Sequence, residues 1–291
     1  MIRALGTLLA GLLGLAFGSF LNVCLSRWPE GESVVHPASH CPSCERVLAW
    51  WENIPLVSWL LLRGQCRTCG TWIGLRHPLV EAAVGLLWAS CAWWWLPSVF
   101  DPAVPAIDAV GSLATMAGRM AFYWLLVALA VLDSENFWLP NWLTLPGTAL
   151  GILCAVLNAF SPNPQSGIVR SPITQIALNL AGIVIAAGLV LLIRWIYWLV
   201  RRQEGMGLGD AKLMAMLAAW LGLRGALLSF GIGVVLGALY GLLLTLPAAR
   251  REQEQWGASK LPLGTFLCIG GIVSSYGGDQ IISAYLRWAG L

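Results

Sequence analysis

Long apolar segments separated by short polar loops run through most of this chain. A helix that crosses the hydrocarbon core of a bilayer needs about 20 predominantly apolar residues. Segments that approach or exceed this length lie at roughly 4–25, 78–96, 112–132, 142–160, 174–199, 211–222, 226–247 and 262–286. Segment 211–222 is short, and 262–286 is rich in glycine. The pattern predicts an all-α polytopic membrane protein with about eight transmembrane helices.

The composition supports a membrane protein. The 291 residues are 58% hydrophobic and 11% charged, with a mean hydropathy of +0.74. Soluble domains carry about 25% charged residues, so we exclude a soluble fold. The net charge of +3 does not indicate a nucleic-acid partner. The 17 tryptophans suit a lipid bilayer partner, because an indole ring is stable at the depth of the headgroups.

The chain divides into three parts. Segment 4–25 is longer than the apolar core of a signal peptide, which spans about 7–15 residues, and no small-x-small cleavage site follows it. We therefore expect residues 1–25 to form the first transmembrane helix. Residues 26–77 are the largest polar insert, and residues 78–291 would form a multi-helix transmembrane domain.

Basic residues predict the orientation, because cytoplasmic loops are enriched in Lys and Arg. Alternate loops, beginning with the insert, carry Arg27, Arg46, Arg63, Arg67, Arg76, Arg201, Arg202, Arg250, Arg251 and Lys260. The opposite loops and the two termini carry Arg3, Arg170, Arg224 and Arg287. We therefore expect the insert to face the cytoplasm and both termini to lie outside.

Two aspartates emerge at the same predicted membrane face. Asp133 directly follows segment 112–132, and Asp210 directly precedes segment 211–222, with two predicted helices between them. Loop 133–141 carries no Lys or Arg, so only the helix count places Asp133 in the cytoplasm. A carboxylate at a membrane boundary is costly unless it is hydrated, paired or used in chemistry. Two neighbouring aspartates can share one proton and activate a water molecule, as in aspartic proteases.

The second aspartate follows a glycine-rich stretch. Gly205, Gly207 and Gly209 permit positive φ and a close backbone approach, so an extended substrate could lie against Asp210. An ordinary helix N-terminus is the alternative, because an aspartate there caps free N–H groups and offsets the helix dipole. Glu135 is the alternative to Asp133 as the second acid.

Four cysteines in the insert form two matched pairs. Cys41 and Cys44 are followed, after 21 residues, by Cys66 and Cys69. Two C-x₂-C pairs supply a tetrahedral set of four sulfur ligands for a structural zinc ion. A reducing cytoplasm favours thiolate–metal bonds over disulfides. Two disulfides are the alternative if the orientation is reversed, and a redox dithiol is less favoured because two matched pairs are present.

Several motifs, in order along most of the chain, together resemble the bacterial prepilin peptidases, also called type 4 leader peptidases. The matching stretches are Gly18–Val23 with Arg27 and Pro29, the paired cysteines, Trp51–Leu56, Gly74 with Arg76 and Pro78–Glu81, Asp133, Leu139–Pro140, Gly205–Leu213, and Leu261–Gly264.

The resemblance implies a bifunctional enzyme of the bacterial inner membrane. It implies that Asp133 and Asp210 are the catalytic aspartates and that type IV prepilins or type II secretion pseudopilins lose a basic leader at the cytoplasmic face. It also implies N-methylation of the new N-terminus with S-adenosylmethionine as methyl donor. No glycine-rich methyl-donor motif is visible, so the donor-binding residues are unassigned. Glu52, Arg67 and Glu81 are candidates for supporting roles.

The chain departs from the family pattern in three places. Asp133-Ser134-Glu135 stands where the family often has Asp-x-Asp, and Leu139-Pro140-Asn141 stands for Leu-Pro-Asp. Pro262-Leu263-Gly264-Thr265 stands for Pro-Phe-Gly-Pro. These changes keep both aspartates and leave the substrate preference open. The rival hypotheses are a membrane transporter or proton relay that uses the two aspartates, and an inactive assembly protein stapled by zinc.

Overall fold

The computed structural model describes residues 2–100, 106–160, 171–202, 207–248 and 261–290. The predicted all-α fold is confirmed: these residues form helices and contain no β-strand beyond isolated bridges. The elements are α1 (Ile2–Arg27), η1 (Trp50–Asn53), α2 (Val57–Leu61), α3 (Arg76–Val99), α4 (Ala106–Asn136), α5 (Asn141–Ala159), α6 (Pro172–Arg201), α7 (Leu208–Ala248) and α8 (Leu263–Trp288).

Six helices in the described part of the chain are long and apolar enough to cross a membrane, namely α1, α3, α4, α5, α6 and α7. The glycine-rich α8, which covers most of the predicted transmembrane segment 262–286, does not reach that hydropathy. The two predicted segments 211–222 and 226–247 both fall within α7, which has 41 residues.

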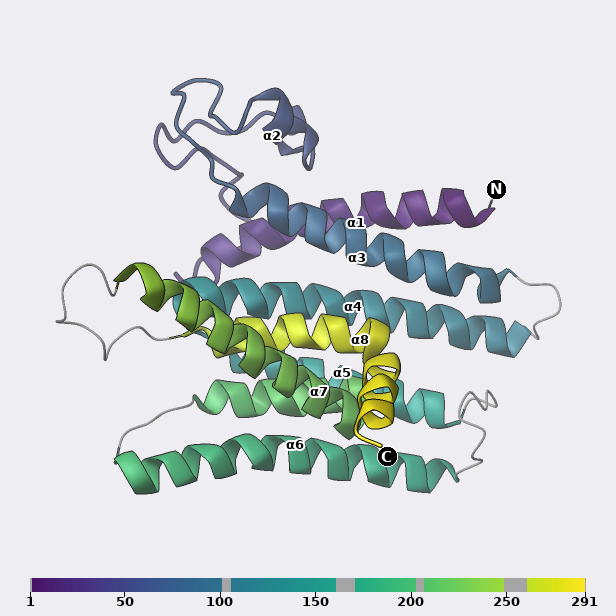
Figure 1. Cartoon of the computed structure of the whole chain (residues 1–291). Helices are drawn as coiled ribbons and strands as arrows, with labels where there is room; N and C mark the ends of the chain where they lie inside the picture. The colour runs from purple at the N-terminus through teal and green to yellow at the C-terminus, as the bar shows by residue number, and fades with distance from the viewer. Residues whose placement is uncertain (1, 101–105, 161–170, 203–206, 249–260, 291) are drawn as a thin grey trace. The chain divides into compact units, whose positions relative to one another are not determined.

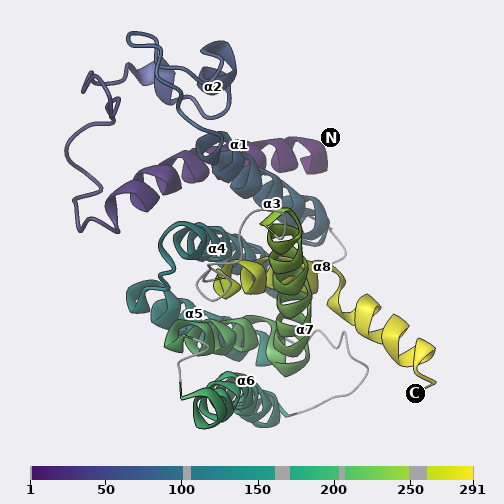
Figure 2. The same cartoon turned by 60° about the vertical axis from the view of Figure 1, so that its left-hand side comes forward.

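Helix α7 consists of two helical segments joined at a break. Gly222 has φ 68° and ψ 175°, a conformation that is essentially restricted to glycine. An unbroken helix of this length would span about 60 Å, twice the hydrocarbon core of a bilayer. Figures 1 and 2 show the two segments pointing in different directions. The predicted division into two segments is thus confirmed, and the break falls at Gly222 rather than within residues 223–225.

The described chain forms two compact units, Met1–Ala128 and Leu129–Leu291, and their boundary falls inside α4. In the first unit α1 packs along α3. Glycines make this contact close: a Cβ atom on Gly18 would lie 2.7 Å from the Cα atom of Glu81. In the second unit α7 packs against α5, α6 and α8. Its first segment lies in the core of that unit, where Leu213, Met214 and Leu217 are fully buried.

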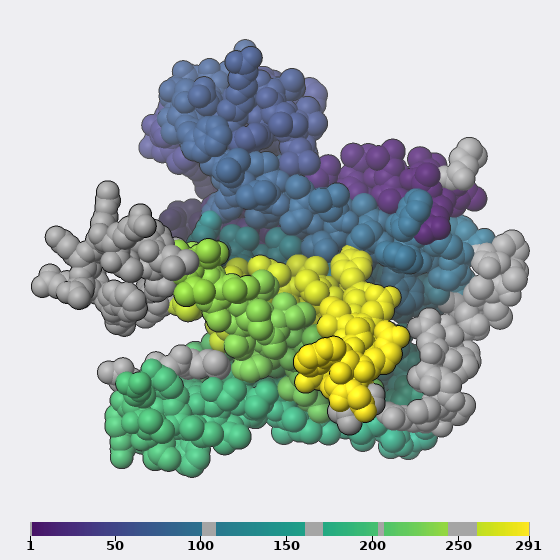
Figure 3. Space-filling model, in the orientation of Figure 1, coloured from purple at the N-terminus to yellow at the C-terminus, as the bar shows by residue number. Residues whose placement is uncertain are grey.

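The insert between α1 and α3 is a small module with little regular structure. In the space-filling view it is the compact blue knob that continues from α3 (Figure 3). Two isolated antiparallel bridges, His40 with Val47 and Gln65 with Trp72, each close a short loop. The indole N–H of Trp59 donates to the Gly74 carbonyl at 3.0 Å and ties the end of the module to its middle.

We expect Gly222→Ala to destabilise the protein. A Cβ atom at this position would meet no other atom within 4 Å, so the cost is the backbone strain of about 1–3 kcal/mol. Gly231→Ala is the matched control, because Gly231 lies in the second segment of α7 with equally open space and no positive φ. That change should be neutral or stabilise by up to about 1 kcal/mol. Thermal unfolding in detergent measures both. Equal melting temperatures for the two variants would contradict a strained break at Gly222.

Candidate functional site

Three helix ends meet in the second unit and bring the two predicted aspartates together. Asp133 lies in the last turns of α4, Asp210 lies in the first turn of α7, and Gly264 lies in the first turn of α8. The side chain of Leu139 packs between these ends. A Cβ atom on Gly209 would lie 3.0 Å from Leu139 Cβ, and one on Gly264 would lie 3.0 Å from Leu139 Cδ1. Both aspartates are buried, with 6% and 8% exposure for Asp133 and Asp210.

Asp133 caps the N-terminus of α8. The Oδ2 atom of Asp133 accepts a hydrogen bond from the Thr265 backbone N–H at 2.8 Å. The first N–H groups of a helix have no partner within the helix, and the N-cap residue Pro262 supplies no side-chain acceptor. Gly264 permits this approach, because a Cβ atom there would lie 2.9 Å from the Asp133 carboxyl carbon. The helix end therefore favours a negative charge on Asp133.

The hydroxyl of Thr265 ties the same turn of α8 to α4. Its Oγ1 atom donates to the Ala130 carbonyl at 2.9 Å and lies 3.3 Å from Asp133 Oδ2. The hydroxyl has a single proton, so the shorter contact takes it while the backbone N–H serves the carboxylate. Thr265 thus fixes both the position of the α8 end and the orientation of Asp133.

Asp210 has a different environment. Its Oδ2 atom accepts one hydrogen bond, from the Gly207 N–H at 3.1 Å. This contact reaches back to the residue before α7, as an acid in the first turn of a helix commonly does. The charge of Asp133 repels that of Asp210. The two carboxylates therefore interact while being held by different helix ends.

In the glycine-rich stretch 205–209, the described glycines lie at the start of α7, and Gly209 allows close packing there. Gly205 lies outside the described residues. Gly207 and Gly209 do not use the positive φ that glycine permits, because neither residue is in the left-handed region. Gly209 lies inside α7, where φ is negative, and its missing side chain makes room for Leu139. An approach of substrate to this turn stays a prediction.

Two polar residues near the aspartates, Glu135 and Lys212, have other environments. Glu135, the alternative acid, is exposed, whereas Asp133 is buried. Lys212 donates to the Asn141 side chain, which links the starts of α7 and α5. Sequence reasoning noted Leu139 and Thr265 in motifs but assigned neither residue a role in the site. The Leu-Pro-Leu-Gly motif that ends at Gly264 pointed to this segment, but its contact with Asp133 depends on the fold.

The four cysteines of the insert form a candidate metal site. Their sulfur atoms all lie within 4.8 Å of one another. The Cys41–Cys69 and Cys44–Cys66 sulfur distances are 3.7 and 4.0 Å. Zinc–sulfur bonds of about 2.3 Å in a tetrahedron place the sulfurs about 3.8 Å apart. The donor set therefore fits zinc. No pair has the roughly 2.05 Å separation of a disulfide, and all the cysteines are free.

The two cysteine loops share one backbone design. The Cys41 N–H donates to the Arg46 carbonyl at 3.0 Å, and the Cys66 N–H donates to the Thr71 carbonyl at 2.9 Å. The residue after the second cysteine is left-handed in both loops. It is Gly70 with φ 70° in one loop and Glu45 with φ 55° in the other. Sequence reasoning missed Glu45, because only glycine marks such a position clearly.

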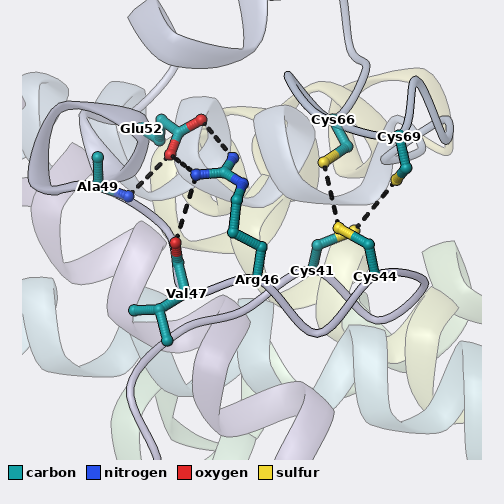
Figure 4. Close-up of polar contacts among 8 residues, drawn as sticks. All are labelled: Cys41, Cys44, Arg46, Val47, Ala49, Glu52, Cys66 and Cys69. Atoms are coloured by element: carbon teal, nitrogen blue, oxygen red, sulfur yellow. Dashed lines mark hydrogen bonds and ion pairs between the residues drawn. The ribbon is translucent and has the colours of Figure 1, made fainter.

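An ion pair between the half-buried Arg46 and the buried Glu52 braces the first loop. Glu52 accepts two hydrogen bonds from Arg46, at 2.7 and 2.9 Å, and one from the Ala49 N–H at 2.7 Å (Figure 4). The Arg46 guanidinium, followed by the Ala49 N–H, lowers the pKa of Glu52 to about 2. In the second loop, backbone N–H groups of Cys69 and Thr68 lower the pKa of Cys66 to about 6. A lowered thiol pKa favours the thiolate that a metal requires.

Family comparisons match both parts of the chain. Residues 12–95 match the bacterial peptidase A24 N-terminal domain, and residues 120–242 match the type IV leader peptidase family. The first match contains all four insert cysteines, and the second contains both aspartates.

Relatives from several bacteria carry the name prepilin leader peptidase/N-methyltransferase. The chain is 33% identical to the protein of Stutzerimonas stutzeri, over 98% of this chain and 95% of the relative. It is 37% identical to that of Myxococcus xanthus, over 87% and 67%, and 32% identical to that of Pseudomonas aeruginosa, over 96% and 93%. No solved structure matches.

We expect the double change Cys41→Ser and Cys66→Ser to abolish zinc binding, because it removes one ligand from each loop. Metal analysis of the purified protein should give one zinc per chain for the wild type and close to none for the variant. Cys91→Ser, at a cysteine in α3 outside the cluster, is the matched control and should keep its zinc. Unchanged zinc in the double variant would rule out the four-cysteine site.

Proposed function

Because this chain belongs to the type IV leader peptidase family, we propose that its two aspartates remove the leader peptide from type IV prepilins or pseudopilins. The protein is a membrane peptidase with N-methyltransferase activity. The convergence of Asp133 and Asp210 from distant helices on one buried site is the observation that carries the proposal. The rival transporter hypothesis gives no role to the cysteine module.

Asp133 and Asp210 take different parts in the proposed cleavage. The N-terminus of α8 stabilises the anionic form of Asp133, which then accepts a proton from the attacking water. Asp210 receives one backbone hydrogen bond and carries the shared proton. That proton passes to the oxygen of the scissile carbonyl as the tetrahedral intermediate forms. Asp133 returns the water-derived proton to the leaving amine as the carbon–nitrogen bond breaks, and Asp210 takes back a proton from a hydroxyl of the intermediate, so no covalent enzyme intermediate is needed.

We assign supporting roles to the rest of the chain. Residues 26–77 form a structural module in which Cys41, Cys44, Cys66 and Cys69 hold zinc, which would supply a rigid cross-link and no reactive position. Within the predicted peptidase domain 78–291, unit Leu129–Leu291 holds the dyad. S-adenosylmethionine is the proposed methyl donor.

The protein is a multi-pass protein of the bacterial inner membrane. The positive charges of the insert support a cytoplasmic position for the insert and for the dyad.

We expect Asp133→Asn and Asp210→Asn each to abolish cleavage of a prepilin, because one carboxylate cannot supply both base and acid. A gel or mass assay of the protein in detergent should show the rate falling by at least about 100-fold. Glu135→Gln removes a nearby exposed acid and should cleave at the wild-type rate. Cleavage by either asparagine variant at the wild-type rate, with normal folding and zinc content, would refute the proposed dyad.

The Thr265 hydroxyl should contribute to turnover. Thr265→Val removes the bond to the Ala130 carbonyl, which is worth about 0.5–1.5 kcal/mol, so kcat for cleavage should fall by about 2–10-fold with KM unchanged. Thr265→Ser keeps the hydroxyl and should restore most of kcat. If the valine variant raises KM alone, or if serine is no better than valine, Thr265 does not position Asp133.

A further inference from the structure

The first unit contains a buried carboxylate that the peptidase mechanism does not use. Glu81 lies in the second turn of α3 and is 8% exposed. Its Oε2 atom accepts a hydrogen bond from the Leu56 N–H of the insert at 2.8 Å. The hydroxyl of Ser19, on α1, also bonds to it. Gly18 allows the backbone of α1 to approach closely enough for this contact.

Among the described residues, no basic side chain forms an ion pair with Glu81. Both of its hydrogen-bond donors are neutral, and the ion pair found among the described residues is that of Arg46 with Glu52. Arg27, the last residue of α1, donates to the carbonyls of Ser33 and Pro37. A buried carboxylate is costly without a counter-charge, so a cationic group supplied by a ligand would stabilise it.

A second acceptor without a donor lies on the same helix pair. Asn22 is 4% exposed, and its amide NH₂ donates to the His77 carbonyl at 3.0 Å. Its Oδ1 atom is buried and accepts no hydrogen bond. Asn22 follows Ser19 by three residues on α1, and His77 precedes Glu81 by four on α3. The Asn22–His77 and Ser19–Glu81 contacts are therefore neighbours along the α1–α3 interface. On each helix, the Cβ atoms of residues at this spacing lie about 5–6 Å apart.

We propose that Glu81 and Asn22 bind a protonated primary amine, the new N-terminal ammonium of the cleaved pilin. An ammonium carries the positive charge that Glu81 lacks and N–H donors for Asn22 Oδ1. This assignment rests on the proposed function, and it gives the methyl-transfer half of the reaction a site in the first unit, apart from the aspartates.

Glu81 also provides the chemistry that methylation of an amine requires. An ammonium has no lone pair, so its nitrogen cannot attack a methyl group. Glu81 takes one proton and leaves a neutral amine. The nitrogen lone pair then forms a bond to the methyl carbon of the sulfonium donor as the carbon–sulfur bond breaks. The bonding pair stays on sulfur, and the product is a methylated ammonium with neutral thioether.

Glu81→Gln tests this role because an amide oxygen can still accept from the Leu56 N–H while the negative charge is lost. The full-length protein in detergent is given a mature pilin peptide with a free N-terminal amine and S-adenosylmethionine. Methylation, followed by mass spectrometry, should fall by at least about 100-fold. Prepilin cleavage should be unchanged. Asn22→Ala should raise the KM for the peptide more than it lowers kcat.

Binding without the methyl donor gives an independent measurement. The wild type should bind the free-amine peptide more tightly than the same peptide with an acetylated N-terminus. Glu81→Gln should remove that difference. Glu30→Gln, which neutralises an exposed acid of the insert, is the matched control and should retain both the preference and the methylation rate.

Three outcomes would overturn the amine site. In the first, Glu81→Gln methylates at the wild-type rate. In the second, it keeps the preference for the free-amine peptide. In the third, its rate of prepilin cleavage falls as much as its rate of methylation although its zinc content is normal, which indicates a structural role for Glu81. A wild-type protein that cleaves but never methylates would also overturn it and leave the peptidase intact. Failure of the wild type to cleave any prepilin would instead contradict the proposed function itself.

Discussion

The capping of α8 by Asp133 is the interaction on which the second unit depends. A carboxylate from the end of α4 satisfies an N–H group at the start of α8, which has no side-chain cap of its own. The same contact stabilises the charge that a catalytic base needs and sets the position of the helix end. Leu139 packs against this end and against Gly209, so Asp210 is held beside Asp133 by the same packing. In the proposed mechanism, stability and catalysis therefore use one set of atoms.

The first unit is stabilised in a different way. Its insert has few residues in regular structure, and a module of this size buries too little apolar surface to be stable alone. The Arg46–Glu52 pair and a zinc ion held by the four closely spaced sulfurs would take the place of a hydrophobic core. Glu81 then ties this module to α3 through Leu56. The bilayer cannot replace a hydrophobic core for the insert, because the insert is the polar connection between α1 and α3, the two helices that could span the membrane.

Sequence patterns predicted the parts that follow from composition and periodicity. Apolar segment lengths gave the helices, helix parity brought Asp133 and Asp210 to one face, and spacing identified the four cysteines. The contacts that complete the site could not be predicted in this way. Thr265 bonds to Asp133 and Ala130 of α4, and Gly209 accommodates the side chain of Leu139, which lies far away in the sequence. Such roles arise only when elements pack, so local propensity carries no signal for them.

The central claim is that Asp133 and Asp210 act as one catalytic unit. Residues that act as a unit show strongly non-additive effects when they are changed together. The direct measurement is a double-mutant cycle for prepilin cleavage, with product accumulation followed by mass spectrometry over long incubations. The doubly changed protein, Asp133→Asn with Asp210→Asn, should be no slower than the slower single variant. A loss equal to the product of the two single losses would show that the aspartates act independently, and it would contradict a shared site.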